Sequence, residues 1–247
     1  MTGFELTLLI AGAAAAGFVN GLAGFGTSLF SLGFWLQVFP PLQAVAMSVV
    51  VATITGAQGL WVVRREMTEN TGRLLRFLLP GIVGIPLGVA ALTWIEPKWL
   101  KLLIAGLMLL YGAFFIARGS LPKLERPTRL ADLTLGFVGG VLGGLAGLSG
   151  ALVVMWLAMR PWPRHVTRAV LQPYNFAILL LTALLLAWNG AYTTEVLKAL
   201  AIALAVAIIA AQVGIAVFKR ITDTQFRWLL IGLMFVSGAV LMLRELI

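Results

Sequence analysis

The chain has 247 residues, of which 61% are hydrophobic and only 11% charged, and its mean hydropathy is +1.01. Charged side chains make up roughly a quarter of a soluble domain, so this composition excludes a soluble globular protein and indicates an integral membrane protein. The chain has no cysteine and a single histidine, His165. Disulfides, thiolate metal sites and multi-histidine metal sites are therefore excluded within one chain, and we expect neither a metal nor a cofactor.

Apolar segments follow one another along the whole chain. No Lys, Arg, Asp or Glu occurs between residues 6 and 63, a stretch that as helix is long enough to cross a ~30 Å hydrocarbon core more than twice. Further charge-free segments occupy residues 77–95, 102–117, 133–159, 169–194, 199–218 and 228–243. The alternation typical of barrel strands is absent, so the predicted fold class is an all-α membrane protein, a polytopic helical bundle.

The sequence also repeats itself. A shift of 123 residues aligns 17–24 with 140–147, and a shift of 126 aligns 103–113 with 229–239. Two homologous repeats, 1–117 and 133–247, are the economical interpretation. The segment between them, 118–132, is polar, basic and interrupted by two prolines, so we expect it to be a linker within one membrane domain.

Glycine clusters at 21–26 and 143–150 interrupt two of the long apolar segments. The segment 133–159 is too long for one straight crossing and too short for two. We therefore expect each glycine-rich stretch to fold back on the side it entered, with arms of about 11 to 13 residues. The loops 64–76, 118–132, 160–168 and 219–227 then share one face that carries 14 of the 18 basic residues. The positive-inside rule makes this face cytoplasmic and places both termini outside.

This topology makes the two repeats inverted copies, an architecture of many secondary transporters. At a broken helix, backbone N–H groups lack partners and carry the positive end of the helix dipole, so two such ends facing one cavity can bind an anion without Lys or Arg. Close helix packing is the other interpretation of these glycines. The candidate substrate-binding residues at the two tips are Asn20, Gly24, Phe25, Gly26, Thr27, Ser28, Gly147, Ser149 and Gly150.

Polar residues inside other spans extend this set, because such residues are costly in lipid and often functional. The additions are Ser48, Gln172, Tyr174 and Asn175, the last three beside the helix-breaking Pro173. Hydrogen bonding to their own or a neighbouring helix is the alternative role. His165 and Arg168, at the inner end of a span, are weaker candidates for gating or attracting anions. For an aromatic substrate, Phe25, Trp156 and Tyr174 are the best-placed rings.

The motifs Gly21-Leu-Ala-Gly-Phe-Gly26, Pro40-Pro-Leu-Gln-Ala-Val-Ala-Met-Ser48 and Gly143-Gly-Leu-Ala-Gly-Leu-Ser-Gly150 resemble the TauE/SafE family of sulfite and organosulfonate exporters, which also contains toluenesulfonate uptake permeases. The resemblance covers nearly the whole chain. It implies transport of a small sulfur-containing anion across the inner membrane, without ATP hydrolysis by the chain itself. The second repeat departs from the family's usual Ala-x-x-Ser element, because it reads Ala169-Val-Leu-Gln172.

Other functions are less consistent with the sequence. An enzyme is disfavoured, because the chain has no His-Glu-x-x-His, no Gly-x-Ser-x-Gly and no carboxylate deep within a predicted span. The net charge of +9 reflects membrane orientation, so the expected partners are a small anionic substrate and the lipid bilayer, with no nucleic acid. An anion channel and a non-transporting scaffold are the alternatives. The coupling ion, the direction of transport and the presence of a homo-oligomer stay open.

Overall fold

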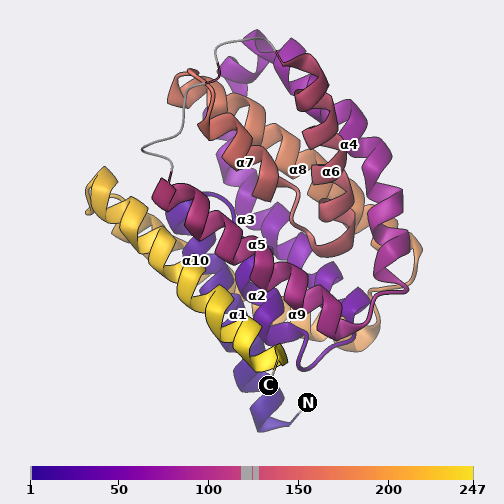
Figure 1. Ribbon diagram of the computed structural model, residues 1–247. Helices are drawn as coiled ribbons and strands as arrows, with labels where there is room; N and C mark the ends of the chain where they lie inside the picture. The colour runs from indigo at the N-terminus through magenta and orange to yellow at the C-terminus, as the bar shows by residue number, and fades with distance from the viewer. Residues whose placement is uncertain (1, 118–123, 125–127, 247) are drawn as a thin grey trace.

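The computed structural model describes residues 2–117, 124 and 128–246, and their side chains except at 58, 59, 61–63, 164, 223, 224, 226 and 227. Within these residues the chain is helical and contains no strand (Figure 1). The helices are α1 (Gly3–Ala23), α2 (Thr27–Trp35), α3 (Pro41–Glu69), α4 (Thr71–Leu92), α5 (Pro97–Ala117), α6 (Arg129–Ala146), α7 (Gly150–Ala158), α8 (Arg164–Trp188), α9 (Thr194–Phe218) and α10 (Asp223–Leu246).

Seven of the described helices, α1, α4, α5, α6, α8, α9 and α10, are long and apolar enough to cross a membrane. Helix α3 has 29 residues, and Pro41–Ala57 is the apolar part of it whose side chains the structure describes. Helices α2 and α7 have nine residues each, which is about 14 Å of helix and too short for a crossing. The predicted all-α membrane fold is confirmed.

Two details of the predicted topology are wrong. Helix continues through most of the expected loops: 64–76 belongs to α3 and α4 apart from a turn at Asn70, 129–132 forms the first turn of α6, and α8 and α10 begin at Arg164 and Asp223. The hairpin arms are also unequal, since α1 has 21 residues and α2 nine. Arg, Lys and Glu are good helix formers, so charges mark where a helix leaves the lipid rather than where it ends. Residues 118–123 and 125–127 of the expected linker lie outside the described residues.

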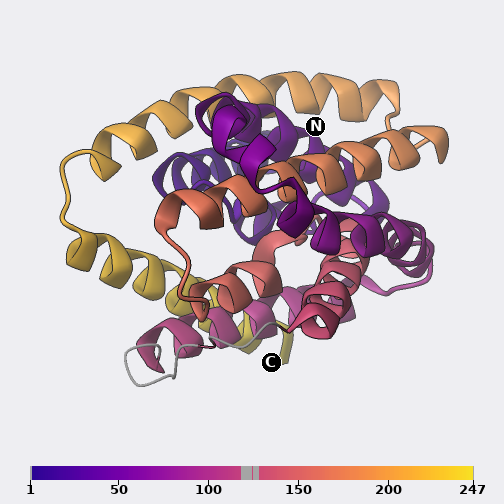
Figure 2. The same cartoon turned by 90° about the horizontal axis from the view of Figure 1, so that it is seen from above.

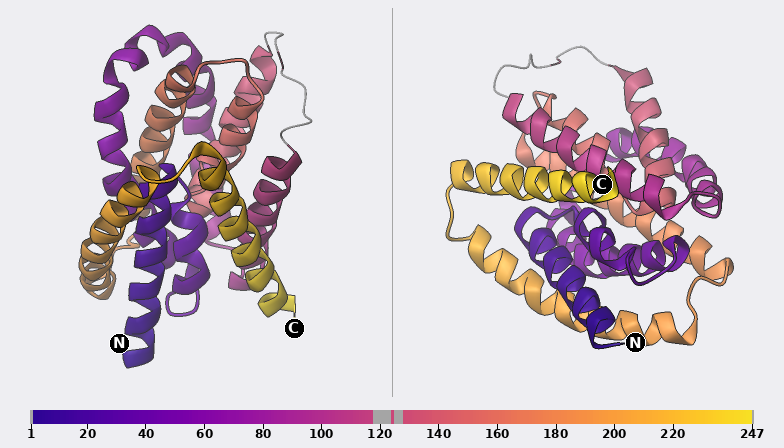
Figure 3. Two further views of the ribbon diagram at one scale, coloured as in Figure 1. Left: turned by 90° about the vertical axis from the view of Figure 1, so that its left-hand side faces the viewer. Right: turned by 60° about the horizontal axis from the view of Figure 1, so that its bottom comes forward.

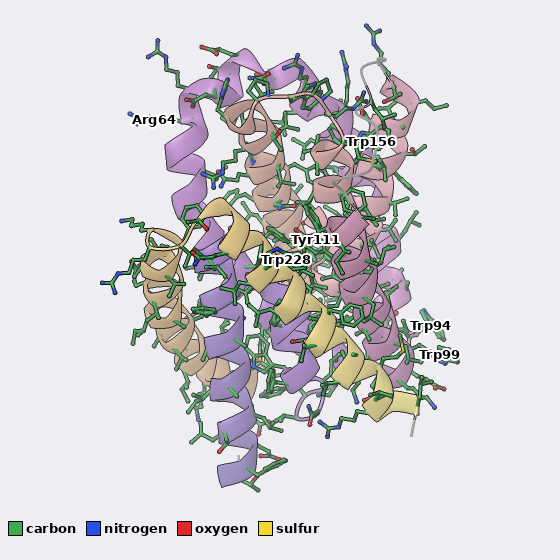
Figure 4. The ribbon with its side chains drawn as sticks, turned by 60° about the vertical axis from the view of Figure 1, so that its left-hand side comes forward. Arg64, Trp94, Trp99, Tyr111, Trp156 and Trp228 are labelled. Atoms are coloured by element: carbon green, nitrogen blue, oxygen red, sulfur yellow. The ribbon has the colours of Figure 1, made fainter. Side chains whose placement is uncertain are left out.

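The chain turns back on itself at both glycine clusters. Helix α1 rises from the N-terminus at the bottom of Figure 1, and α2 returns downward, while α6 descends from the top and α7 returns upward (Figures 1 and 3). The start of α1 and the end of α10 lie at the bottom, and the α3–α4 turn lies at the top. Arg64 and Trp156 lie toward the top end, whereas Trp94 and Trp99 lie at the other end (Figure 4), where exposed indole rings are typical of a membrane interface.

Helices from the two halves of the sequence interleave. Seen from above, α9 lies along α1 at one edge and α8 lies beside α3 (Figure 2), and α4 packs on α6 and α10 on α5. Glycines allow the closest of these approaches. A Cβ on Gly17 of α1 would overlap the backbone of Ala207 in α9, and a Cβ on Gly140 of α6 would overlap the backbone of Gly81 in α4. The small-residue packing considered for these clusters therefore occurs at both helix pairs.

The shifts that align the two sequence repeats also carry one helix contact onto the other. Gly17 shifted by 123 is Gly140, and Gly81 shifted by 126 is Ala207, so the α1–α9 contact corresponds to the α4–α6 contact. Three further contacts of glycines correspond in the same way: Gly21 on Ala211 with Gly144 on Ile85, Gly214 on Phe18 with Gly88 on Val141, and Gly112 on Phe235 with Gly238 on Leu109. The repeat in the sequence is thus accompanied by a repeat of tertiary contacts.

A buried ion pair closes the open end of the α6–α7 hairpin. Arg160 Nη2 lies 3.0 Å from Asp132 Oδ1, and the two residues are only 8% and 2% exposed. Trp156 Nε1 donates to the same carboxylate oxygen at 2.8 Å, and the guanidinium also donates to Thr128 Oγ1 and stacks 4.8 Å from the centre of the Trp156 ring. Asp132 was expected in the linker, but it lies in the first turn of α6.

Candidate substrate-binding site

Glycines in the left-handed conformation interrupt the helix at the turn of each hairpin. Helix α1 ends at Gly24 (φ 76°) and α2 begins after Gly26 (φ 90°), whereas α6 ends at Gly147 (φ 65°) and α7 begins at Gly150. Only glycine adopts this conformation at little cost. These glycines therefore serve the turns, whereas Gly17 and Gly140 serve helix packing.

The two tips meet. A Cβ on Gly147 would lie 2.5 Å from Ser28 Oγ and 2.9 Å from a methyl carbon of Val49, so the second tip sits against the start of α2. Gly24 is at the equivalent place in the first repeat. A Cβ on Gly24 would lie 3.9 Å from Gln172 Nε2 and would meet no other atom within 4 Å outside its chain neighbours. Gln172 is Val49 shifted by 123, so equivalent residues face the two tips, a valine at one and a glutamine at the other.

A cavity of about 240 Å³ lies between the tips, with α3, α8 and α9 forming the rest of its wall. Of the thirteen predicted substrate-binding residues, eleven line it: Asn20, Gly24, Phe25, Gly26, Thr27, Ser28, Gly147, Ser149, Gly150, Gln172 and Asn175. Among the described residues of this wall, none carries a charged side chain. An anion held here would depend on hydrogen-bond donors and helix dipoles.

The first turns of α2 and α7 supply such donors. Thr27, Ser28 and Gly150 line the cavity, and neither helix has a side-chain cap at its N-terminus. The N–H of Ala151, by contrast, donates to Leu148 O at 3.2 Å. The first N–H groups of a helix have no intrahelical partner. The carbonyls at the ends of α1 and α6, by contrast, accept bonds from Gly24 N at 2.7 Å and Gly147 N at 2.8 Å. The first turns of α2 and α7 therefore offer unpaired N–H groups at the tips, and such groups favour a negative ligand.

A hydrogen-bonded chain of three buried serines provides a further donor to the cavity. Ser48 Oγ donates to Ser28 Oγ at 2.8 Å, and Ser31 Oγ lies 3.0 Å from Ser48 Oγ. A hydroxyl has one proton to donate, so Ser31 is the donor to Ser48, and the Ser28 O–H stands at the cavity end of the chain. Ser48 itself does not line the cavity, since it is fully buried behind Ser28.

At the second tip, side-chain amides lie beside a serine hydroxyl. Ser149 Oγ donates to Asn175 Oδ1 at 3.0 Å, and the Asn175 amide covers Gly150 so closely that a Cβ there would lie 2.7 Å from Nδ2. Within the described part of the chain, Gln172 Oε1 is buried without a hydrogen-bond partner. A buried unpaired carbonyl costs about 1–3 kcal/mol, so this oxygen lowers the stability of the fold.

The other predicted residues lie away from the cavity. Tyr174 is fully buried, and its hydroxyl donates to Gly136 O of α6 at 2.9 Å. His165 and Arg168 are exposed, and Trp156 belongs to the Asp132 ion-pair cluster. Of the predicted rings, only Phe25 lines the cavity, 5.5 Å from the ring of Tyr111.

Sequence reasoning left Thr55 and Gln212 out of the site, although both line the cavity. Gln212 stands alone in an apolar segment and Thr55 follows Thr53 in α3, and for a threonine in a helix a bond to the helix's own backbone is the common explanation. Thr55 makes such a bond, to Val51 O at 2.6 Å. The signal that could have found them is their helical spacing from other cavity residues, which needs the partner helices to be known.

Comparisons with known proteins identify relatives of the chain by sequence. The family model described as sulfite exporter TauE/SafE matches residues 8–241. The curated protein "Probable sulfite/organosulfonate exporter TauE" of Cupriavidus necator is 26% identical over 227 residues, which cover 90% of this chain and 88% of that protein. No solved structure matches the chain significantly. Because the family model spans nearly the whole length, the chain belongs to the TauE/SafE family of sulfite exporters.

Proposed function

We propose that the chain is a secondary transporter that moves a small sulfur-containing anion, sulfite or an organosulfonate, by alternating access. The observation that carries the proposal is the uncharged cavity between two helix N-termini, which come from equivalent places in the two repeats. Oriented N–H dipoles and hydroxyls can hold an anion firmly enough to bind and weakly enough to release. The name of the Cupriavidus necator relative supports the choice of anion.

The size of the cavity agrees with a small substrate. Its volume of about 240 Å³ lies below the roughly 300–1,000 Å³ of pockets for drug-sized ligands. Donors gather at the tips, whereas Ile54, Leu179, Ile208 and Ile215 give the remaining wall an apolar character. This division suits an oxyanion group with or without a short organic tail.

The orientation in the membrane follows from the repeat. We infer that residues 1–117 and 133–247 are inverted copies, which the opposite directions of α1 and α6 and the paired glycine contacts support. The basic end, with the segments 64–76, 118–132, 160–168 and 219–227, then faces the cytoplasm of the inner membrane by the positive-inside rule. His165 and Arg168 precede Gln172 on one face of α8, at spacings of seven and four residues, and attract anions toward the cavity from that side.

Reconstituted liposomes test the proposal. We expect saturable uptake of radiolabelled sulfite or of a small organosulfonate, and stimulation of that uptake when the same unlabelled anion is loaded inside. Such counterflow is a property of carriers. Anion currents without counterflow would show that the protein is a channel and not a carrier. The absence of any flux would favour a non-transporting scaffold.

Replacing Gln172 with valine, the residue at the equivalent position of the first repeat, should weaken substrate binding and leave the protein at least as stable. The change removes the amide donors beside Gly24 and also removes a buried unpaired carbonyl. We expect the apparent KM for sulfite to rise roughly two- to tenfold, while the melting temperature stays equal or rises.

Thr182→Val is the matched control. Thr182 Oγ1 is also buried without a partner in the described chain, but the residue does not line the cavity. This variant should raise the melting temperature without changing the KM. If Gln172→Val left the KM at the native value, Gln172 would have no part in binding.

A further inference from the structure

The two repeats adopt different conformations around equivalent positions. Thr55 of α3 lines the open cavity. Its equivalent after a shift of 123 is Ile178 of α8, which is fully buried. A methyl carbon of Ile178 lies 2.6 Å from a Cβ built on Gly143, and another lies 2.9 Å from a Cβ built on Gly81. One repeat is therefore open where the other is filled.

Tyr174 strengthens the filled side. Its hydroxyl donates to Gly136 O, and its ring lies 6.4 Å from that of Phe77 in an edge-on arrangement. The equivalent residue in the first repeat is Val51. Helix α8 thus packs closely against glycines of α4 and α6, and a side chain larger than glycine at Gly81 or Gly143 would displace it.

The equivalent place in the first repeat borders the cavity. Gly143 shifted back by 123 is Asn20, and Asn20 and Thr55 both line the cavity, whereas Gly143 and Ile178 do not. Ile208 and Gln212 of α9 line the cavity beside them. The cavity therefore lies where α3 faces α1 and α9, and the equivalent place between α8, α6 and α4 is filled by Ile178.

We infer that Ile178 and Tyr174 form the closed gate of the transport pathway, that Asn20 and Thr55 form the open gate, and that transport exchanges the two states. The inference rests on the proposed carrier function. Its physical basis is that two copies of one helical arrangement show both conformations in the same chain, so that each repeat has a ready template for the state of the other. In this exchange α3 moves closer to α1, and α8 moves away from Gly81 of α4 and Gly143 of α6.

Paired cysteines test this exchange, because the native chain has no cysteine of its own. The first pair is Gly143→Cys with Ile178→Cys. The Ile178 methyl carbon that lies 2.6 Å from the Gly143 Cβ position is one bond from its own Cβ, so the two Cβ atoms fall within disulfide range. The matched pair is Asn20→Cys with Thr55→Cys, at the equivalent positions.

We expect the 143–178 pair to form a disulfide in the resting protein, to lower sulfite counterflow at least tenfold, and to recover when the disulfide is reduced. The 20–55 pair should form its disulfide slowly at rest and faster while substrate is being transported. Because Asn20 lines the cavity, this second pair is scored by crosslinking and not by flux. Equal crosslinking of both pairs at rest, or full counterflow in the crosslinked 143–178 variant, would overturn the gate assignment.

Single substitutions keep the test decisive if a pair fails to fold. A membrane-impermeant maleimide should label Thr55→Cys and should not label Ile178→Cys in the resting protein. Labelling of both at the same rate would also overturn the assignment. Transport by the native chain distinguishes the two proposals. If the native chain carries no sulfite or organosulfonate, the proposed function is wrong. If the native chain transports and the 143–178 crosslink has no effect on transport, only the gate assignment is wrong.

Discussion

Replacing Gly147 with leucine should abolish transport. The residue has a φ of 65°, and a Cβ there would lie 2.5 Å from Ser28 Oγ and 2.9 Å from Val49. The left-handed conformation costs a non-glycine residue about 1–2 kcal/mol, and overpacking adds about 1–3 kcal/mol. Together these costs lower the population of the native tip arrangement at least about thirtyfold. Sulfite counterflow in liposomes should therefore fall to the background of empty vesicles.

Two other left-handed glycines separate strain from obstruction. Gly24→Leu introduces the same strain and places its side chain in the cavity, while Gly190→Leu introduces the strain in a loop with no atom within 4 Å of the new Cβ. We expect Gly24→Leu to lose transport and Gly190→Leu to keep it, with similar amounts of protein inserted in the membrane. Normal transport by both Gly24→Leu and Gly147→Leu would remove the tips from the mechanism.

Replacing Arg160 with methionine should produce the largest loss of stability. The substitution leaves the Asp132 carboxylate, which is 2% exposed, without its cationic partner. Removing one member of a buried ion pair typically costs about 3–5 kcal/mol. The free energy of unfolding, measured by denaturant titration in mixed micelles, should fall by about this amount. The KM for the transported anion should stay near native, because neither residue lines the cavity.

The double variant Asp132→Leu with Arg160→Met is the control for this prediction. Removing both charges leaves no buried ion to desolvate, so the double variant should recover most of the lost stability. A double variant as unstable as Arg160→Met would show instead that packing around Trp156, and not charge, explains the loss.

The sequence predicted the tips well, because glycine positions and helix polarity are local properties. Gly24, Gly26 and Gly147 break helices for a reason visible in the residue type itself. Local patterns could not predict which face of α8 meets the cavity. Tyr174 lies between Gln172 and Asn175 in the sequence, yet it points to α6, because adjacent residues on a helix face different directions.

Charge led the interpretation astray at helix ends. Asp132 was assigned to the linker because it is charged, but it lies in the first turn of α6 and pairs with Arg160, which lies in the loop after α7 as expected. Predicting such a pair requires knowing that two helices converge there. The different conformations of Thr55 and Ile178 are likewise absent from the sequence, since the aligned repeats predict equivalent places and not unequal states.

A structure with a bound anion tests the central claim most directly. Selenite is the probe, because it resembles sulfite and its selenium is located by anomalous scattering. We expect selenium between the first turns of α2 and α7, within hydrogen-bonding reach of Ser28 Oγ and the neighbouring backbone N–H groups. Selenium bound beside His165 and Arg168 with the cavity empty, or no selenium in the cavity at concentrations that saturate transport, would contradict the account.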